Sequence, residues 1–255
     1  MMNGGYIWIV SKKNDQLSNY IIERLRDLNT PFLQTDPRRV SDLNLSLIDE
    51  KFYIERKLIK GIFLRAGPDS FYNNSFINQD SAFCNSEIGA LLLAAVNLES
   101  ILAINKCDAQ LWFDKSTWTV WRNRFLQNDI KVANFKFGES EFEKSTYWLP
   151  YNGTVIRESP EYEIRRELGA AVTDVPPSFK FLQIGKEILG NHCNVDVKDL
   201  TDFIINQGTF VSELLTDSEG NIISINTLPV IKSKNTLIKV SNLIAKEFYD
   251  FMLNR

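Results

Sequence analysis

The chain offers few side chains for nucleophilic or zinc chemistry. Its single histidine, His192, stands directly before Cys193, and any serine–histidine–aspartate or cysteine–histidine site would have to use it. Neighbouring residues of a strand point to opposite faces, so this pair is poorly placed to act together. One histidine and three scattered cysteines also lack the ligand spacing of a zinc site. The sequence therefore argues against both kinds of site.

Glycine-rich phosphate loops are absent as well. Neither the three-glycine dinucleotide fingerprint nor a Walker sequence ending in Gly-Lys-Ser/Thr occurs. The first apolar run is followed by residues 11–15, which contain no glycine that would let a backbone approach a pyrophosphate. Binding of NAD in the usual manner is therefore not expected.

The segment from Arg65 to Asp69 is a candidate binding loop. It follows residues 61–64, which are predicted to form a buried strand, and open α/β sheets place ligand contacts at the carboxyl ends of such strands. An arginine there can hold a carboxylate or phosphate with its planar fork. Arg65 and Asp69 can equally form a surface pair that closes a tight turn, and the sequence favours neither alternative.

An aromatic helix face is the second candidate for binding. Trp118, Trp121 and Phe125 recur at i, i+3 and i+7. The two tryptophans could stack on a ligand or a partner, but aromatic side chains at helical spacing favour core packing.

The elements that must position these residues begin with a strand–helix–strand unit. Residues 6–10 form a continuous apolar run, typical of a strand covered on both faces. Apolar residues with helical spacing follow over residues 17–28, and Pro31 ends this helix. Residues 32–36 then predict a second strand, so the unit is expected to be a right-handed βαβ crossover. The candidates for capping its helix are Asn14, Asp15 and Ser18.

Further strands are predicted around residues 52–54, 61–65 and 101–104, and together they would close a small parallel sheet. Residues 83–98 predict a helix that is apolar nearly all round and therefore well buried.

The second half of the chain has shorter predicted strands. Residues 210–216 and 221–225 flank a turn and predict a hairpin. The chain is predicted to close with a helix, whose inner stripe is formed by Leu237, Val240, Leu243, Ile244 and Phe248.

Several of these pieces resemble the ATP-grasp superfamily, and especially its peptide-ligase and peptide-maturase branch. The opening unit and residues 61–68 resemble the pre-ATP-grasp domain of those enzymes. Asn105 falls where the family commonly has an asparagine before its ATP-binding region. Residues 220–229 look like the last ATP-grasp strand, where the family usually carries Glu-x-Asn followed shortly by proline.

In that last strand, Asn226 matches the family pattern, whereas Ser224 stands where the resemblance places the glutamate. Residues i and i+2 of a strand face the same way and can reach one magnesium ion. In a simple hairpin register Glu213 would lie opposite Ser224 and could supply the missing oxygen, although a one-residue slip would turn it away. If the protein is active, the resemblance implies that Glu213 and Asn226 bind the metal.

The chain also departs from the family pattern. The stretch between residues 110 and 200 looks too short for the two lobes that hold ATP, and the ATP-binding lysines have no clear counterpart.

Composition excludes several other classes of protein. The formal net charge of -3 and the pI of about 5.4 argue against a general nucleic-acid binder. The longest apolar stretch, residues 88–96, is far shorter than the roughly 20 residues that cross a bilayer. The few cysteines fit a reducing compartment, so a cytoplasmic protein is expected.

We therefore expect an α/β protein with two domains. Residues 1–110 would form a Rossmann-like pre-ATP-grasp domain with a parallel sheet, and residues 111–255 a reduced α+β ATP-grasp-like domain. The expected function is that of an accessory or degenerate ATP-grasp-like protein in peptide or amino-acid modification, as in natural product biosynthesis. It would bind a peptide or a partner enzyme without a cofactor. The residues expected to make this contact are Arg65, Asp69, Trp118 and Trp121.

The alternative is an active carboxylate–amine ligase that depends on ATP and magnesium, in which an amine attacks an acyl-phosphate. In either case the sequence leaves open whether the protein forms a homodimer.

Overall fold

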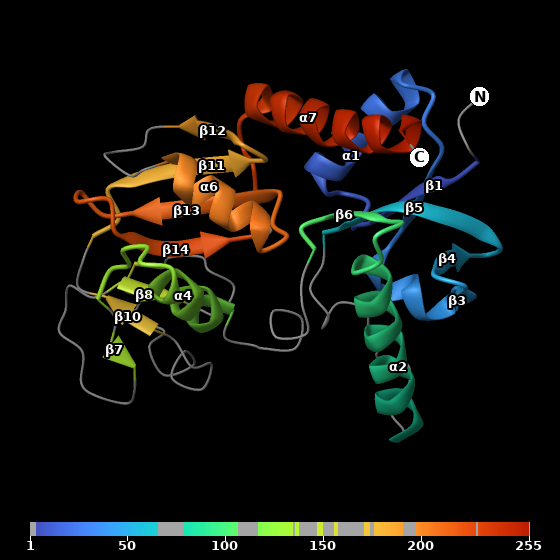
Figure 1. Cartoon of the computed structure of the whole chain (residues 1–255), viewed down its shortest axis with the longest axis horizontal. Coiled ribbons are helices and arrows are strands. Elements are labelled where there is room, and N and C mark those ends of the chain that lie inside the picture. Colours follow the sequence, from blue (N-terminus) through green and yellow to red (C-terminus); the bar gives the residue numbers. More distant parts are fainter. Residues whose placement is uncertain are drawn as a thin grey trace. The chain divides into compact units, whose positions relative to one another are not determined.

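The chain divides into two compact units, each described here by itself (Figure 1). The computed structural model describes residues 4–65, 79–106, 117–134, 136–137, 147–149, 156–157, 171–173, 176–190, 197–227 and 229–254. Unit 1 consists of Met1–Trp112 together with Val230–Arg255, and unit 2 consists of Phe113–Pro229. The predicted division near residue 110 placed all later residues in the second domain. The last segment instead packs in the first, because its helix buries an apolar stripe there.

Unit 1 is a six-stranded mixed sheet with helices. Its elements are β1 (Tyr6–Val10), α1 (Gln16–Asp27), β2 (Phe32–Thr35), a 3-10 helix (Pro37–Asp42), β3 (Leu45–Ile48), β4 (Lys51–Ile54), β5 (Lys57–Leu64), α2 (Gln79–Val96), β6 (Leu102–Ile104) and α7 (Lys234–Leu253).

The predicted strand–helix–strand unit is confirmed. β1 pairs in parallel with β2 on one side and with β5 on the other. Of the three candidate caps, Asp15 begins α1, and its carboxylate accepts the backbone N–H of Ser18. After the helix, Asn29 adopts a positive φ of 52° that turns the chain back toward β2.

The expectation of a wholly parallel sheet is wrong for β4, and β3 is a strand that was not predicted from the sequence. β6 pairs in parallel with β5, but β4 pairs antiparallel with both β3 and β5. The cause is local, because the turns at Asp49-Glu50 and Glu55-Arg56 have positive φ at both residues. Two-residue turns of this kind fit the twist of antiparallel hairpins.

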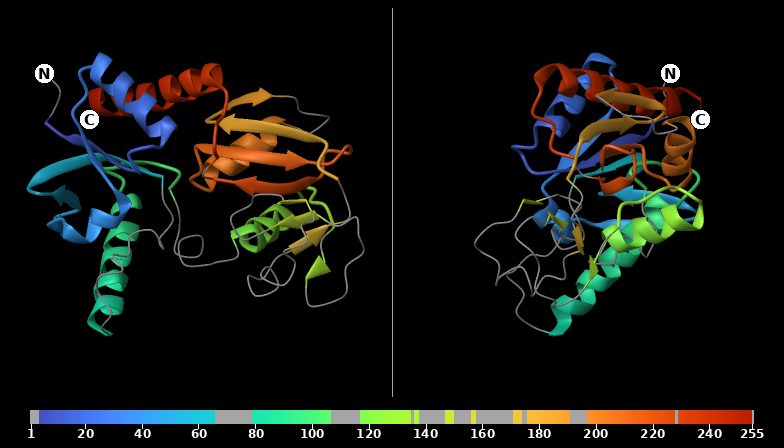
Figure 2. Two further views of the ribbon diagram at one scale, coloured as in Figure 1. Left: turned by 180° about the vertical axis from the view of Figure 1, so that it is seen from behind. Right: turned by 90° about the vertical axis from the view of Figure 1, so that its left-hand side faces the viewer.

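Helices pack against the sheet of unit 1. α1 and α7 lie side by side (Figures 1 and 2), and Phe248 of α7 meets the sheet at Gly61. A separate core cluster joins Trp8, Phe52 and Ile62 of the sheet to Leu92 of α2. Because alternate residues of a strand face opposite sides, β1 contributes to both layers.

The prediction that the second helix is buried nearly all round is wrong for its described side chains. Leu92, Ala95 and Val96 of α2 are buried, whereas Glu87 and Ala94 are exposed. Only one face of this helix packs on the sheet. Its apolar composition was therefore a poor guide to how much of it is buried.

Unit 2 contains two four-stranded antiparallel sheets, in the orders β7-β10-β8-β9 and β12-β11-β13-β14. Its elements are α4 (Thr117–Gln127), β7 (Lys136–Phe137), β8 (Tyr147–Leu149), β9 (Ile156–Arg157), β10 (Ala171–Thr173), β11 (Phe179–Ile184), β12 (Glu187–Gly190), α6 (Val197–Asn206), β13 (Val211–Thr216) and β14 (Ile222–Asn226). Among the described residues of both units, no helix is long and apolar enough to span a membrane.

Candidate functional site

The predicted hairpin of β13 and β14 is held by one buried carboxylate. Asp217 accepts the backbone N–H groups of Glu219 and Asn221 at 2.9 and 2.8 Å, and the side-chain amide of Asn221 at 2.7 Å. An aspartate that bonds to backbone N–H groups ahead of it is a strong turn former. It places the end of β13 against the start of β14.

A bulge next to this turn sets which residues lie opposite each other. The ladder pairs Thr216 with Ile222, but after an irregularity Leu215 pairs with Ser224. Glu213 therefore lies opposite Asn226, and the simple register that placed it opposite Ser224 is wrong. Without the bulge Glu213 would lie opposite Ile225, with its side chain on the other face. The bulge thus puts Glu213, Ser224 and Asn226 on one face.

A lysine from the neighbouring strand joins this face. Lys180 of β11 pairs with Leu215, so its side chain lies on the same side of the sheet as Glu213. The Lys180 Nζ is 2.7 Å from a Glu213 carboxylate oxygen. The lysine side chain is 61% exposed and that of Glu213 17%, so the pair stands at the surface. Alternation of residues 179–184 could have indicated that Lys180 faces solvent, but only the register shows its partner.

The opposite face of the same sheet is core. Gln183 and Ser212 lie there and bond to each other at 2.8 Å, and the Gln183 amide donates to the Gly185 carbonyl at 2.7 Å. Every residue of the set is at most 3% exposed: Phe181, Gln183, Ser212, Leu214, Ile223 and Ile225. Charged chemistry is therefore confined to the face of Glu213.

Arg65, predicted as a binding residue, forms an internal ion pair. Its Nε and Nη2 lie 3.3 and 3.2 Å from the two carboxylate oxygens of Asp15, and its side chain is only 7% exposed. The pair ties the end of β5 to the start of α1. Asp69, the other predicted residue of this loop, lies outside the described residues.

The environment of Asp15 shifts its pKa. Burial raises the pKa of this carboxyl, but the charge of Arg65 and the hydrogen bonds from Arg65 and Ser18 outweigh burial and hold the pKa below its ordinary value. Asp15 is therefore a charged structural group rather than a proton donor at neutral pH.

The predicted aromatic face contains two tryptophans, and the structure describes the side chain of Trp121. Trp121 is buried, and its ring packs 5.6 Å from that of Phe125, which in turn meets Phe203 of α6 at 5.5 Å. The core-packing alternative therefore applies to Trp121. The side chain of Trp118 lies outside the described part of the chain.

Comparison with known proteins found similar structures but no similar sequence. No family model and no curated protein matches the sequence. The ATP-grasp ligase PsnB, solved with precursor peptide PsnA2 and AMPPNP, matches with a TM-score of 0.70 and 11% identity over 99% of this chain and 98% of that chain. The chain has the ATP-grasp fold.

Further solved structures with this fold are similar. Macrocyclase MdnC from Microcystis aeruginosa MRC, bound with precursor peptide MdnA, gives a TM-score of 0.69 at 8% identity over 96% of this chain and 99% of that chain. A RimK domain ATP-grasp protein from Sphaerobacter thermophilus DSM 20745 gives 0.59 at 13% identity, over 98% and 100%. The fold that the resemblance implies is thus confirmed, and the similar structures include peptide-modifying ligases. The similarity extends well beyond the segments that suggested it.

The ATP-grasp fold makes magnesium the ion to test against the residues of the Glu213 face. Around Glu213 that face offers this carboxylate, the amide oxygen of Asn226 and the hydroxyl of Ser224. Glu187 of β12 faces the same side by register, but it lies beyond β11 at the far edge of the sheet. Magnesium is usually held by one or two carboxylates together with waters and phosphate oxygens, so Glu213 and Asn226 fit part of such a set. Within the described residues, no group of three or more histidine, cysteine, aspartate and glutamate side chains could hold a metal. Protein atoms alone therefore do not complete a site on this face.

Proposed function

We propose that this protein binds a peptide in a peptide-modification pathway, on an ATP-grasp scaffold whose magnesium–nucleotide site is weakened. The observation that carries the second part is the composition of the Glu213 face. Ser224 stands where a second carboxylate is expected, and Lys180 already neutralises the carboxylate of Glu213. The peptide part is supported by PsnB and MdnC, which share the fold and were solved with precursor peptides.

The electrostatic cost of losing one carboxylate is large for a divalent ion. Unit charges 4 Å apart near a protein surface interact by about 4 kcal/mol, and magnesium carries two charges. A bound ion would also have to draw Glu213 away from Lys180. Both effects lower magnesium affinity.

A second candidate function is an active carboxylate–amine ligase. The observation in its favour is that Lys180, Glu213 and Asn226 gather on one face of the ATP-grasp sheet. ATP would supply the phosphoryl group that activates a carboxylate for attack by an amine. Glu213 and Asn226 would then hold magnesium, and Lys180 would compensate negative charge beside them.

A melting experiment with Mg-AMPPNP separates the two candidates. A ligand present at 100 times its dissociation constant adds about 2.7 kcal/mol of stability, which would raise the melting temperature by roughly 5–10 °C in a protein of this size. We expect a rise of less than about 1 °C in millimolar Mg-AMPPNP, because the site lacks one carboxylate.

Glu213→Gln is the matched variant for this experiment. It keeps the size of the side chain and removes the charge, and the ion pair that it breaks is exposed on the lysine side and worth at most about 1 kcal/mol. Under the proposal, wild type and variant respond alike to the nucleotide. A large rise in the wild type that Glu213→Gln abolishes would favour the active ligase.

The peptide part is tested separately. Short peptides whose reading frames lie next to the gene are synthesised, and their binding to the protein is measured by titration calorimetry. Saturable binding without nucleotide is the expected result. If each of these peptides fails to bind with and without Mg-AMPPNP, the peptide part is wrong, whatever the nucleotide does.

A further inference from the structure

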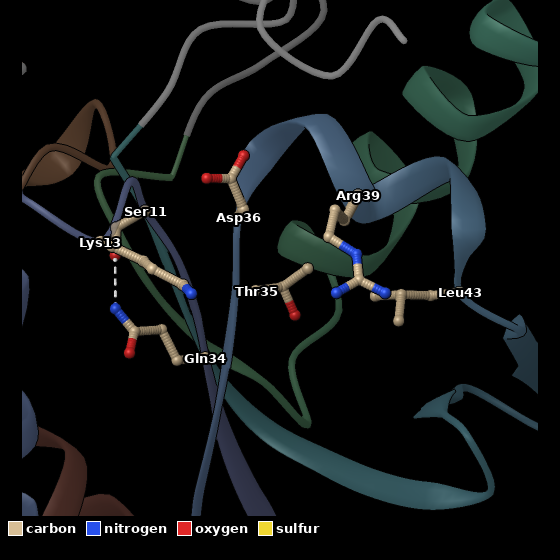
Figure 3. Close-up of a pocket in the computed structure, with 7 residues that line it drawn as sticks. All are labelled: Ser11, Lys13, Gln34, Thr35, Asp36, Arg39 and Leu43. Carbon is tan, nitrogen blue, oxygen red and sulfur yellow. Dashed lines mark hydrogen bonds between the residues drawn. The ribbon is translucent and has the colours of Figure 1, made fainter.

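A pocket of about 270 Å³ opens in unit 1, at the carboxyl ends of the parallel strands β1 and β2 (Figure 3). This edge of an open α/β sheet is where ligands commonly bind. The side chains that decide its chemistry are Ser11, Lys13, Gln34, Thr35, Asp36 and Arg39.

The two hydroxyl groups in the pocket are set up as donors. The indole N–H of Trp8 donates to the Thr35 hydroxyl at 3.0 Å. The Gln34 amide donates to the Ser11 hydroxyl at 3.3 Å, as the dashed line in Figure 3 shows. Each hydroxyl thus accepts a bond from the protein and keeps its own O–H. Within the described part of the chain, neither O–H has a protein acceptor. An incoming group with acceptor oxygens would satisfy both.

Two cations reach the pocket from different elements. Lys13 follows β1 and extends its ammonium group toward β2, whereas Arg39 comes from the 3-10 helix after β2 (Figure 3). Among the described residues, no carboxylate lies within ion-pair distance of the Lys13 ammonium. Arg39 Nε is 3.6 Å from Asp42, in a pair whose side chains are 76% and 47% exposed. Such a pair is weak and leaves the terminal nitrogens of Arg39 for a ligand.

One carboxylate, that of Asp36, also lines the pocket, and it caps a helix. Asp36 accepts the backbone N–H of Arg38 at 3.0 Å and so caps the 3-10 helix. Figure 3 shows its carboxylate directed away from the Arg39 guanidinium. The pocket therefore carries two positive charges and one negative charge.

We infer that this pocket binds a carboxylate group of a small or peptide-borne ligand, between Lys13 and Arg39 and under the hydroxyls of Ser11 and Thr35. A volume of about 270 Å³ is below the roughly 300–1,000 Å³ of pockets for whole drug-sized ligands, so it suits a group of side-chain size. Leu43 lines the pocket and offers an apolar wall for the carbon chain. One excess positive charge matches a singly charged carboxylate better than a phosphate dianion. The inference does not depend on the proposed function, because the pocket uses unit 1 residues only.

The test is a titration of the full chain, followed by amide chemical shifts in NMR spectra. The probes are glutarate, Ac-Gly-Glu-Gly-NH2, their neutral counterparts glutaramide and Ac-Gly-Gln-Gly-NH2, and inorganic phosphate. Concentrations up to about 20 mM cover dissociation constants near 1 mM, as expected for one charged group. Glutarate or the glutamate peptide, or both, should produce saturable shifts around Ser11 and Thr35, and the neutral probes should not. Tighter binding of the peptide than of glutarate would identify a peptide as the source of the carboxylate.

Lysine variants give a matched comparison. Lys13→Gln should weaken carboxylate binding about tenfold, because it removes a charge-assisted contact, and Arg39→Gln should weaken it to a similar extent. Lys12→Gln changes an exposed lysine that does not line the pocket, and it should alter affinity less than about twofold. All three side chains are exposed, so the variants should fold. The inference is overturned if no probe saturates, if phosphate binds while carboxylates do not, if the neutral probes bind equally well, or if Lys12→Gln and Lys13→Gln have equal effects.

Discussion

Replacing Asp15 by alanine should lower the free energy of unfolding by about 3 kcal/mol. Loss of an N-cap side chain typically costs about 1 kcal/mol. The remainder comes from the ion pair with Arg65, which is 7% exposed and therefore poorly screened by solvent. Urea-induced unfolding followed by circular dichroism measures the change.

Asp15→Asn is the control that separates the cap from the charge. It keeps a side-chain oxygen for the N–H of Ser18 and removes the charge that faces Arg65, so we expect about two thirds of the loss caused by alanine. A loss equal to that of alanine would assign the whole effect to the ion pair. A loss near zero would show that the pair contributes nothing.

Asp15→Asn also tests how the free energy of unfolding depends on pH. The pKa of Asp15 is lower in the folded protein than in the unfolded chain. Its contribution is therefore complete above the unfolded pKa of about 4, and it is lost as the pH falls through the folded pKa. The difference between wild type and Asp15→Asn should be constant near neutral pH and shrink below about pH 4. A difference that grows on acidification would contradict the sign of this shift.

Replacing Phe248 by alanine should destabilise unit 1 by about 3–5 kcal/mol, the usual cost of truncating a fully buried phenylalanine. Phe248 is completely buried, and it belongs to α7, the last helix of the chain, which packs in unit 1. Leu253→Ala on the same helix is the control, because Leu253 is exposed and should change stability by less than about 0.5 kcal/mol. Equal effects of the two variants would show that α7 does not seal the core.

Gly61 makes the packing of Phe248 testable in a double-mutant cycle. A Cβ atom on Gly61 would lie 2.7 Å from the Phe248 ring and 2.6 Å from the end of Ile7. Gly61→Ala alone should therefore cost about 1–3 kcal/mol through overpacking. In combination with Phe248→Ala the new methyl group enters the vacated space, so the double variant should lose about 1 kcal/mol less than the sum. Strict additivity would mean that the two positions do not touch in solution.

The sequence by itself predicted the elements whose signals are local. The apolar run of β1, the helical spacing of α1 and the stop at Pro31 define the strand–helix–strand unit, because each depends only on neighbouring residues. The hairpin of β13 and β14 is of the same kind, since its turn is held by Asp217 and Asn221 within the turn itself. These segments also carry the resemblance to the ATP-grasp superfamily, and the solved structures confirm the fold that this resemblance implies.

The tertiary structure alone decided which distant residues meet. Lys180 reaches Glu213 only because β11 and β13 pair in one register, and Asn226 shares their face only because of a bulge. Arg65 finds Asp15 across 50 positions of the chain, at a contact made by packing rather than by spacing. Periodicity records which side of an element is apolar, but it carries no information about strand register or about the partner that covers a face. For that reason the elements with local signals follow from the sequence, whereas strands such as β3 and the charged clusters do not.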